Sequence, residues 1–203
     1  MARLTDDNVR LAHEIIARYP RPRSATIPLL HLAQEQDGYV SNEAIKHVAE
    51  LVGASAAEVL GTATFYEMFK FEPVGTYLIN ICGTMSCALM GAEELMHHAQ
   101  QRLGVPVGGT TPDGLFTLEH AECQAACTEA PCLQVNYRHR FRVTPGDLDR
   151  LIDDLRAGRL ESEIPAHGTL ARVRQQIPAD RAAGPVTPEQ VGAPAWFPTK
   201  DPA

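Results

Sequence analysis

The sequence predicts a protein of mixed α+β and α/β class, with an N-terminal helical bundle, a β-α-β-β-α domain and an extended C-terminal tail. Residues 1–74 place apolar side chains at helical spacing, without the alternation typical of strands. From residue 75 onwards, short β-prone stretches alternate with helical ones. Seven of the 15 prolines fall within residues 165–203, a composition that disfavours a packed core. The predicted boundaries are 1–74 for the bundle, 75–160 for the second domain and 161–203 for the tail.

Capping and stop signals delimit the helices of the first part. A side-chain oxygen before a helix satisfies a free backbone amide, and a glycine after a helix adopts the left-handed conformation that ends it. The signals in chain order are Thr5 before a helix that ends ahead of Pro20, a helix over 27–36 with a stop at Asp37-Gly38, Ser41 before a helix that stops at Gly53, and the capping box Ser55 to Glu58 before a helix through about Tyr66. We interpret the aromatic run at residues 64–66 as helix core.

The second part is typical of a strand–helix–strand unit followed by a hairpin and a helix. The predicted elements are a strand over 76–81 that runs into Cys82, a helix from about Ala88 to Gly104, a strand over 115–120, hairpin strands over 133–137 and 141–143 around a basic tip at 138–140, and a helix from Thr144-Pro145 to Gly158. This order fits a layered α/β arrangement in which the first two strands are parallel. For the tail, we expect ordering only against a partner, with Trp196-Phe197 as anchors.

Composition excludes several classes of function. The chain has 203 residues and a formal net charge of −7, which disfavours binding to nucleic acid. Its apolar runs are far shorter than the roughly 20 residues that span a bilayer, and no signal-peptide pattern follows the first methionine. We therefore expect a cytoplasmic protein without direct membrane insertion. An odd count of five cysteines favours metal or redox chemistry over a disulfide framework.

Four of the cysteines form two pairs, and each pair begins where a predicted strand ends. Cys82 and Cys87 form a C-x4-C pair, and Cys123 and Cys127 form a C-x3-C pair after 35 intervening residues. Since parallel strands end at the same edge of a sheet, the two loops can converge. Four thiolates could hold either Zn²⁺ or a [2Fe–2S] cluster. The open spacing favours iron–sulfur, because zinc sites usually use tight C-x2-C turns. A zinc-stabilised structural module stays as the alternative.

Further features of this region bear on the site. We expect the helix after Cys87 to direct its positive end towards the cluster. We interpret Cys132 as a small buried apolar residue with no ligand role, and His120 as a strand residue with an ordinary partner. The sequence shows neither a dinucleotide-binding fingerprint nor a P-loop, so no complete active site is expected on this chain alone.

Several motifs, in order along residues 8–160, resemble one known family. They are Tyr19-Pro20, Arg23-Ser24-Ala25, Ile27-Pro28-Leu29-Leu30, Gly38-Tyr39, Thr64-Phe65-Tyr66-Glu67-Met68-Phe69, the C-x4-C pair, and the stretch from Glu122 to Pro131 that holds the second pair. The family comprises the E subunits of respiratory NADH:quinone oxidoreductase (complex I), which are its thioredoxin-like [2Fe-2S] subunits.

The resemblance implies a thioredoxin-like [2Fe-2S] ferredoxin domain with one [2Fe–2S] cluster on Cys82, Cys87, Cys123 and Cys127. It implies an electron-transfer role, without catalytic residues on this chain. FMN and NADH would bind the adjacent flavoprotein subunit, and the partners would be that subunit and the other peripheral-arm subunits. The protein would then lie at the membrane surface as part of a larger complex. The equivalent small subunit of an NAD-linked formate dehydrogenase or hydrogenase is the alternative within the same family.

One residue departs from the family pattern. Ala125 stands between the cysteines of the second pair, where the family usually has glycine. If this position needs a positive φ, alanine would be strained there. We expect a small local adjustment with ligation intact.

Overall fold

The computed structural model describes residues 3–168. The expectations for residues 169–203 of the tail, Trp196-Phe197 included, lie outside the described residues. The described chain divides into two compact units, residues 3–69 and 70–168. The finer boundaries predicted from the sequence stay predictions.

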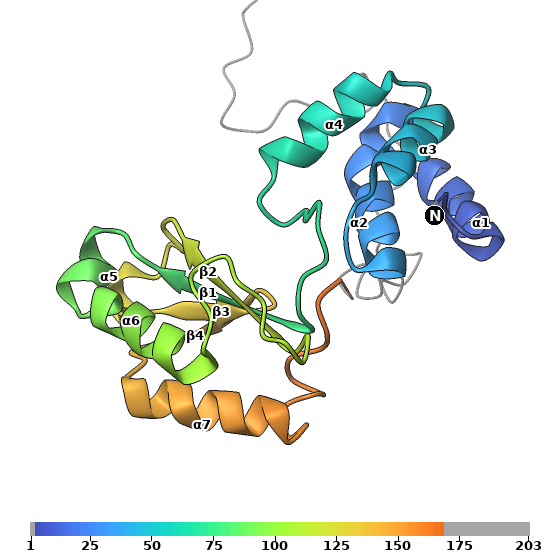
Figure 1. The fold of residues 1–203 in the computed structure, drawn as a ribbon. Coiled ribbons are helices and arrows are strands. Elements are labelled where there is room, and N and C mark those ends of the chain that lie inside the picture. The colour runs from blue at the N-terminus through green and yellow to red at the C-terminus, as the bar shows by residue number, and fades with distance from the viewer. Residues whose placement is uncertain (1–2, 169–203) are drawn as a thin grey trace, which may run out of the picture. The chain divides into compact units, whose positions relative to one another are not determined.

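The first unit consists of helices, which appear in blue to teal in Figure 1. They are α1 (Asp6–Ile16), the short 3-10 helix η1 (Pro22–Ala25), α2 (Thr26–Asp37), α3 (Asn42–Val52) and α4 (Ala56–Phe65). The predicted capping is confirmed: the Thr5 and Ser41 side chains accept from amides of the first turns of α1 and α3, and Ser55 and Glu58 form the reciprocal box of α4. Local hydrogen bonds that the sequence encodes therefore set where these helices begin.

Helix α2 supplies much of the core of this unit. Leu29, Leu30 and Ala33 are fully buried. The interpretation of residues 64–66 as helix core is wrong, because all three are exposed and the side chain of Phe65 is 78% exposed. The buried residues of α4 are Val59 and Ala63, one turn apart, and Phe65 follows two positions later, on another side of the helix.

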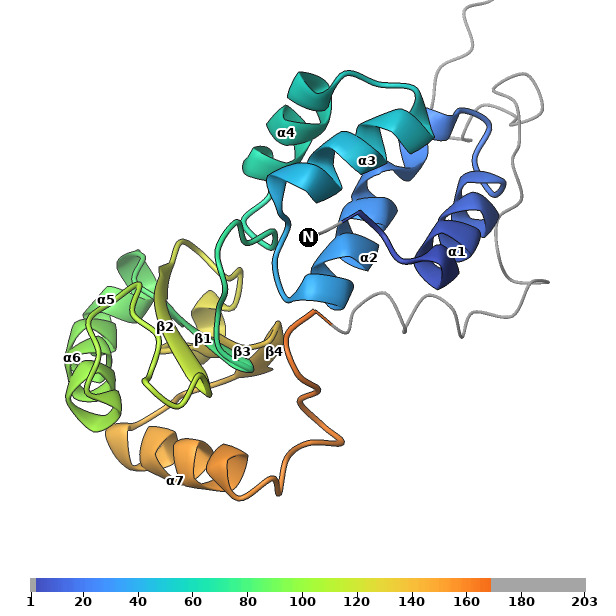
Figure 2. The ribbon, with the colours of Figure 1, turned by 45° about the vertical axis from the view of Figure 1, so that its right-hand side comes forward.

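The second unit is built on a four-stranded mixed sheet in the order β2-β1-β3-β4, shown in Figures 1 and 2. Strand β1 (Tyr77–Cys82) pairs in parallel with β2 (Phe116–Ala121) and antiparallel with β3 (Leu133–Val135), which pairs antiparallel with β4 (Arg138–Arg140). The helices are α5 (Met85–Leu89), α6 (Ala92–Leu103), the one-turn η2 (Cys127–Glu129) and α7 (Pro145–Arg156). The core lies between the sheet and helices α6 and α7, and the predicted fold class is confirmed.

The predicted helix from Ala88 to Gly104 is in fact two helices. Gly91, with a φ of 96°, interrupts the chain, so that α5 ends at Leu89 and α6 begins at Ala92. Helix α5 begins at Met85, before Cys87 and not after it. Cys87 therefore lies inside a helix of five residues, and the expectation of a helix N-terminus just after this cysteine is wrong.

The predicted hairpin is shifted by its turn. Asn136 and Tyr137 have φ values of 46° and 66°, which is the backbone of a two-residue type I′ turn. The basic residues 138–140 consequently form strand β4, not the hairpin tip, and residues 141–143 lie beyond the strand. The tight turn pairs Val135 directly with Arg138, which fixes the register.

Asn136 also ties three segments of this unit together. Its side-chain oxygen accepts a hydrogen bond from the Leu78 amide at 2.8 Å. Its side-chain amide donates to the carbonyl oxygens of Thr76, at 2.8 Å, and Pro165, at 2.9 Å. The residue is only 5% exposed, so these groups would be buried without partners if the side chain were removed.

No single helix within residues 3–168 is long and apolar enough to cross a membrane. Helices α3 and α4 reach the necessary length and composition only as a pair, and the two are bent by 115° at the break between them.

We predict that Asn136→Ala lowers the free energy of unfolding by about 2–4 kcal/mol, because it leaves buried groups unpaired and places alanine at positive φ. Asn136→Gly loses the same hydrogen bonds but adopts the positive φ without strain. It should therefore be destabilised by about 1 kcal/mol less than the alanine variant. Urea unfolding followed by circular dichroism measures both. A cost below about 1 kcal/mol for the alanine variant would contradict this role.

Candidate metal centre

The two cysteine loops leave the same edge of the sheet. In the parallel pairing of β1 with β2, Cys82 lies opposite Ala121, so the last residue of one strand faces the last residue of the other. The Gly83 amide donates to the Ala121 carbonyl at 3.0 Å and carries the pairing one residue further. Strand β3 enters this edge from the opposite direction, with Leu133 beside Ile81, and brings Cys132 with it.

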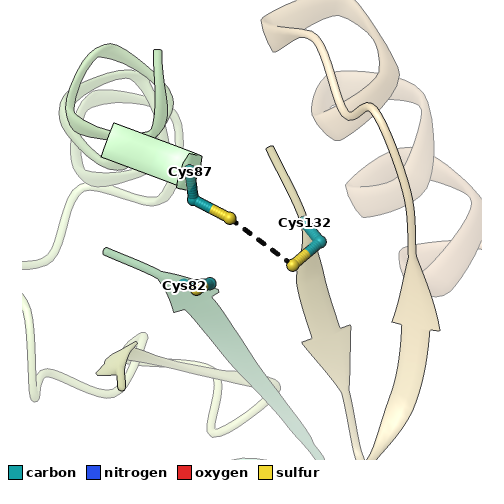
Figure 3. Close-up of side chains that lie close together, drawn as sticks. All are labelled: Cys82, Cys87 and Cys132. Atoms are coloured by element: carbon teal, nitrogen blue, oxygen red, sulfur yellow. Dashed lines mark hydrogen bonds between the residues drawn. The ribbon is translucent and has the colours of Figure 1, made fainter. Parts of the chain in front are cut away.

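Three buried thiols gather at this edge. Cys82 and Cys87 are each 2% exposed and Cys132 is 1% exposed. Their sulfur atoms all lie within 4.8 Å of one another. Figure 3 shows Cys132 pointing towards Cys87, and the two sulfur atoms are 3.7 Å apart. The burial expected for Cys132 is confirmed, but its contact with the first cysteine pair was not foreseen.

The second pair lies on an exposed loop that is held by hydrogen bonds of its own. The sulfur atoms of Cys123 and Cys127 are 4.0 Å apart. The Ala125 amide donates to the Cys123 sulfur at 3.4 Å. The Gln124 side chain donates to the Asn80 carbonyl at 2.9 Å and so fastens the loop to strand β1.

Thr84 lies between the two loops. Its hydroxyl lies 3.3 Å from the Cys82 sulfur, and the same side chain also helps to lower the pKa of Cys123 in the second loop. The backbone amide of Gln124, from the second loop, helps to lower the pKa of Cys82 as well. The second loop thus lies beside the first, but the thiols that lie within 4.8 Å of one another are those of Cys82, Cys87 and Cys132, and Cys123 and Cys127 are not among them. The role of the two predicted pairs as ligands stays a prediction.

Hydrogen bonds and burial divide the thiols into two kinds. Burial raises the pKa of Cys82, but the Thr84 hydroxyl and the amides of Gln124 and Thr84 outweigh burial and lower this pKa to about 7. The Ala125 amide and the Thr84 hydroxyl lower the pKa of Cys123. Burial raises the pKa of Cys87, and it raises the pKa of Cys132 to about 12. Cys132 is therefore the thiol that most strongly resists the deprotonation that a metal ligand needs.

The donor set fits a thiolate-bound iron centre. Two thiolates on one tetrahedral metal, each about 2.3 Å from the ion, lie about 3.8 Å apart. The 4.0 Å separation of the second pair is close to this value. Amide and hydroxyl donors already face the sulfur atoms, as the negative charge of an iron–sulfur cluster requires.

Ala125 does adopt the positive φ at which alanine is strained. Its φ is 57°, in the left-handed region, and this backbone aims its amide at the Cys123 sulfur. The strain expected for a non-glycine residue is thus present, and the local geometry accommodates it.

His120 lies against the backbone beside Cys82. A Cβ atom added to Gly83 would lie 2.0 Å from the Nε2 atom of His120, so any other residue at this position would make the exposed His120 ring shift.

Thr84 and Gln124, as partners of the sulfur atoms, were not foreseen from the sequence. The signal that was available is position, because each residue lies inside a cysteine pair and carries hydrogen-bond donors.

Comparison with known proteins agrees with this geometry. Residues 12–156 match the family model described as thioredoxin-like [2Fe-2S] ferredoxin.

Individual relatives point to one group within that family. NADH-quinone oxidoreductase subunit 2 of Thermus thermophilus is 40% identical over 166 residues, which cover 80% of this chain and 92% of that protein. The NADH-quinone oxidoreductase E subunit of Mycobacterium tuberculosis is 37% identical over 203 residues, which cover 95% of this chain and 78% of that protein. The chain therefore belongs to the thioredoxin-like [2Fe-2S] ferredoxin family, in the group of NADH-quinone oxidoreductase E subunits.

A solved structure shares the fold. An NAD⁺-reducing [NiFe]-hydrogenase in the air-oxidised state superposes with a TM-score of 0.58 at 21% sequence identity, covering 79% of this chain and 25% of that chain. At this identity the likeness concerns the fold alone.

We predict that Ala125→Gly raises the free energy of unfolding by about 1 kcal/mol, because glycine adopts positive φ without the steric cost that alanine bears. Ala126 has a φ of −121°, so Ala126→Gly is the matched control and should be neutral or destabilising. Urea unfolding of the purified chain measures both variants. Equal effects at the two positions would contradict strain at Ala125.

Proposed function

We propose that this chain holds one [2Fe–2S] cluster on Cys82, Cys87, Cys123 and Cys127, and exchanges single electrons with the FMN of an adjacent flavoprotein subunit of NADH-quinone oxidoreductase. The observation that carries the proposal is that both cysteine loops leave the same edge of the sheet, where Cys82 lies opposite Ala121 and the Gln124 side chain fastens the second loop to Asn80. Membership of the [2Fe-2S] family supplies the identity of the cluster.

The ligands divide by loop. We assign Cys82 and Cys87 to one iron and Cys123 and Cys127 to the other. Cys132 is the fifth thiol; it stands outside both pairs, and we assign it to neither iron. The zinc alternative is disfavoured because the family is that of [2Fe-2S] ferredoxins.

The protein's part in the chemistry is to hold the ligands and set their electrostatics. When bound, the cluster supplies one-electron transfer, and its formal charge with four thiolates goes from about −2 to about −3 on reduction. The Ala125 amide and the Thr84 hydroxyl lie within hydrogen-bond range of ligand sulfur atoms and would stabilise this charge. Substrate oxidation is assigned to the flavoprotein, where NADH and FMN bind.

The relatives support the choice of complex. Those 37–40% identical to this chain are subunits of NADH-quinone oxidoreductase, whereas the hydrogenase shares 21% identity and a fold. We therefore place the chain with the flavoprotein and the other peripheral-arm subunits of complex I, on the cytoplasmic side of the membrane. The alternative of a formate dehydrogenase or hydrogenase subunit would be decided by which flavoprotein co-purifies with it.

We predict that the chain purified anaerobically is reddish-brown, contains two iron atoms and no zinc, and gives a paramagnetic signal after reduction. Serine substitution at any of the four ligands should reduce the bound iron severalfold, because a thiolate is lost. Cys132→Ser is the matched control and should keep the cluster. Metal analysis and electron paramagnetic resonance measure both. A colourless protein with one zinc per chain would end the iron–sulfur assignment.

A second prediction concerns electron exchange. In the complex with the flavoprotein subunit, NADH should reduce FMN and bring the cluster into redox equilibrium with it. Rapid-freeze electron paramagnetic resonance follows the cluster, and the complex carrying Cys123→Ser is the control. A cluster that dithionite reduces but whose redox state never responds to the flavin would refute exchange while leaving cluster binding intact.

A further inference from the structure

Cys132 makes a contact that the proposed ligand set does not use. Its sulfur lies 3.7 Å from the sulfur of Cys87, within hydrogen-bond range for sulfur, and both side chains are buried. The dashed line in Figure 3 marks this contact. Cys132 directly precedes β3 and Cys87 lies in α5, 45 positions apart in the sequence. The fold, not chain proximity, therefore brings the two thiols together.

Ligation fixes the direction of this hydrogen bond. In the metal-free chain either sulfur could donate the proton. A cysteine bound to iron is a thiolate without a proton, so Cys87 can then only accept. This step rests on the proposed function, because it takes Cys87 as a ligand.

We propose that the Cys132 thiol donates a hydrogen bond to the ligand sulfur of Cys87 and thereby raises the reduction potential of the cluster. Hydrogen bonds to cluster sulfur atoms are among the factors that set the potential. Reduction adds one negative charge, so a donor at a ligand sulfur stabilises the reduced state more than the oxidised state. Cys132 is thus a positioning and tuning residue, not a ligand.

The surroundings of Cys132 hold the thiol in this role. It is 1% exposed and belongs to a small buried cluster with Ala92 and Ala130, so bulk solvent does not reach the thiol. Its backbone is held as well, because its carbonyl accepts a hydrogen bond from the Cys82 amide at 3.2 Å. Side-chain substitutions leave this backbone bond available, so they isolate the contribution of the thiol.

The test is a redox titration of the full-length chain with its cluster, followed by electron paramagnetic resonance. Cys132→Ala removes the donor. The equilibrium constant for reduction of the cluster should fall about threefold in this variant, as expected for the loss of one modest hydrogen bond. For a one-electron couple, at about 59 mV per tenfold change, this fall lowers the reduction potential by about 30 mV. Cys132→Ser keeps an O–H donor and should recover part of this shift or all of it.

A second measurement does not depend on the size of the shift. The chain is unfolded in H₂O or in D₂O, so that the thiol proton of Cys132 exchanges with the solvent before the thiol is buried. The chain is then refolded and its cluster is reconstituted in the same solvent. Electron–nuclear double resonance of the reduced cluster should then detect an exchangeable proton coupling in the wild type that Cys132→Ala lacks and that differs in Cys132→Ser.

Each other outcome has a definite meaning. A folded Cys132→Ala chain that has lost its iron would make Cys132 a ligand and overturn the proposal. An unchanged potential together with an unchanged proton coupling would overturn it as well. Failure of the underlying function is distinguishable, because it would show in the wild-type chain as zinc or no metal before any variant is made.

Discussion

Strand β1 pairs with β2 in parallel, and the site depends on that register. With Cys82 opposite Ala121, both cysteine loops begin at one edge of the sheet and at the same level. A slip of one residue would turn the Cys82 side chain to the other face of the sheet. The antiparallel pairing of β3 then adds Cys132 to the same edge from a distant part of the chain. The geometry of the thiols is thus a consequence of backbone hydrogen bonds that contain no sulfur.

The groups around the sulfur atoms are neutral donors. The Thr84 hydroxyl and the amides of Ala125 and Gln124 offer dipoles to the sulfur atoms. Dipoles held by the fold stabilise charge without reorganising when an electron arrives, a property that suits a centre whose charge alternates. The strained backbone of Ala125 belongs to this arrangement, because it directs the amide of that residue to the Cys123 sulfur.

Much of the fold could be predicted because its signals are local. The caps at Thr5, Ser41 and Ser55 act within one helical turn, and sequence alone contains them. The hairpin was misplaced because its turn needs positive φ at Tyr137, a residue type that gives no hint of it. The break at Gly91 was missed since an isolated glycine is also tolerated inside helices.

The candidate site, like the fold, could be predicted only in part. The cysteine spacing identifies the two loops, and parallel pairing predicts that they meet. The Cys87–Cys132 contact could not be predicted, because it depends on the strand with which β3 pairs and on the residue at which α5 begins. The same holds for Thr84, whose reach to both loops is a property of the folded edge.

The hydrogen bond from the Asn136 side-chain amide to the Pro165 carbonyl bears on where the sheet unit ends. Composition alone would cut the chain at residue 160, where proline becomes frequent. Yet Ile164 is fully buried in the core of the sheet unit, and the His167 amide donates to the Thr76 carbonyl at 2.9 Å. A fragment trimmed at 160 would lose a core side chain and would leave the buried side-chain amide of Asn136 without one of its acceptors. Expression fragments of the sheet unit should therefore retain the segment that follows α7, up to residue 168.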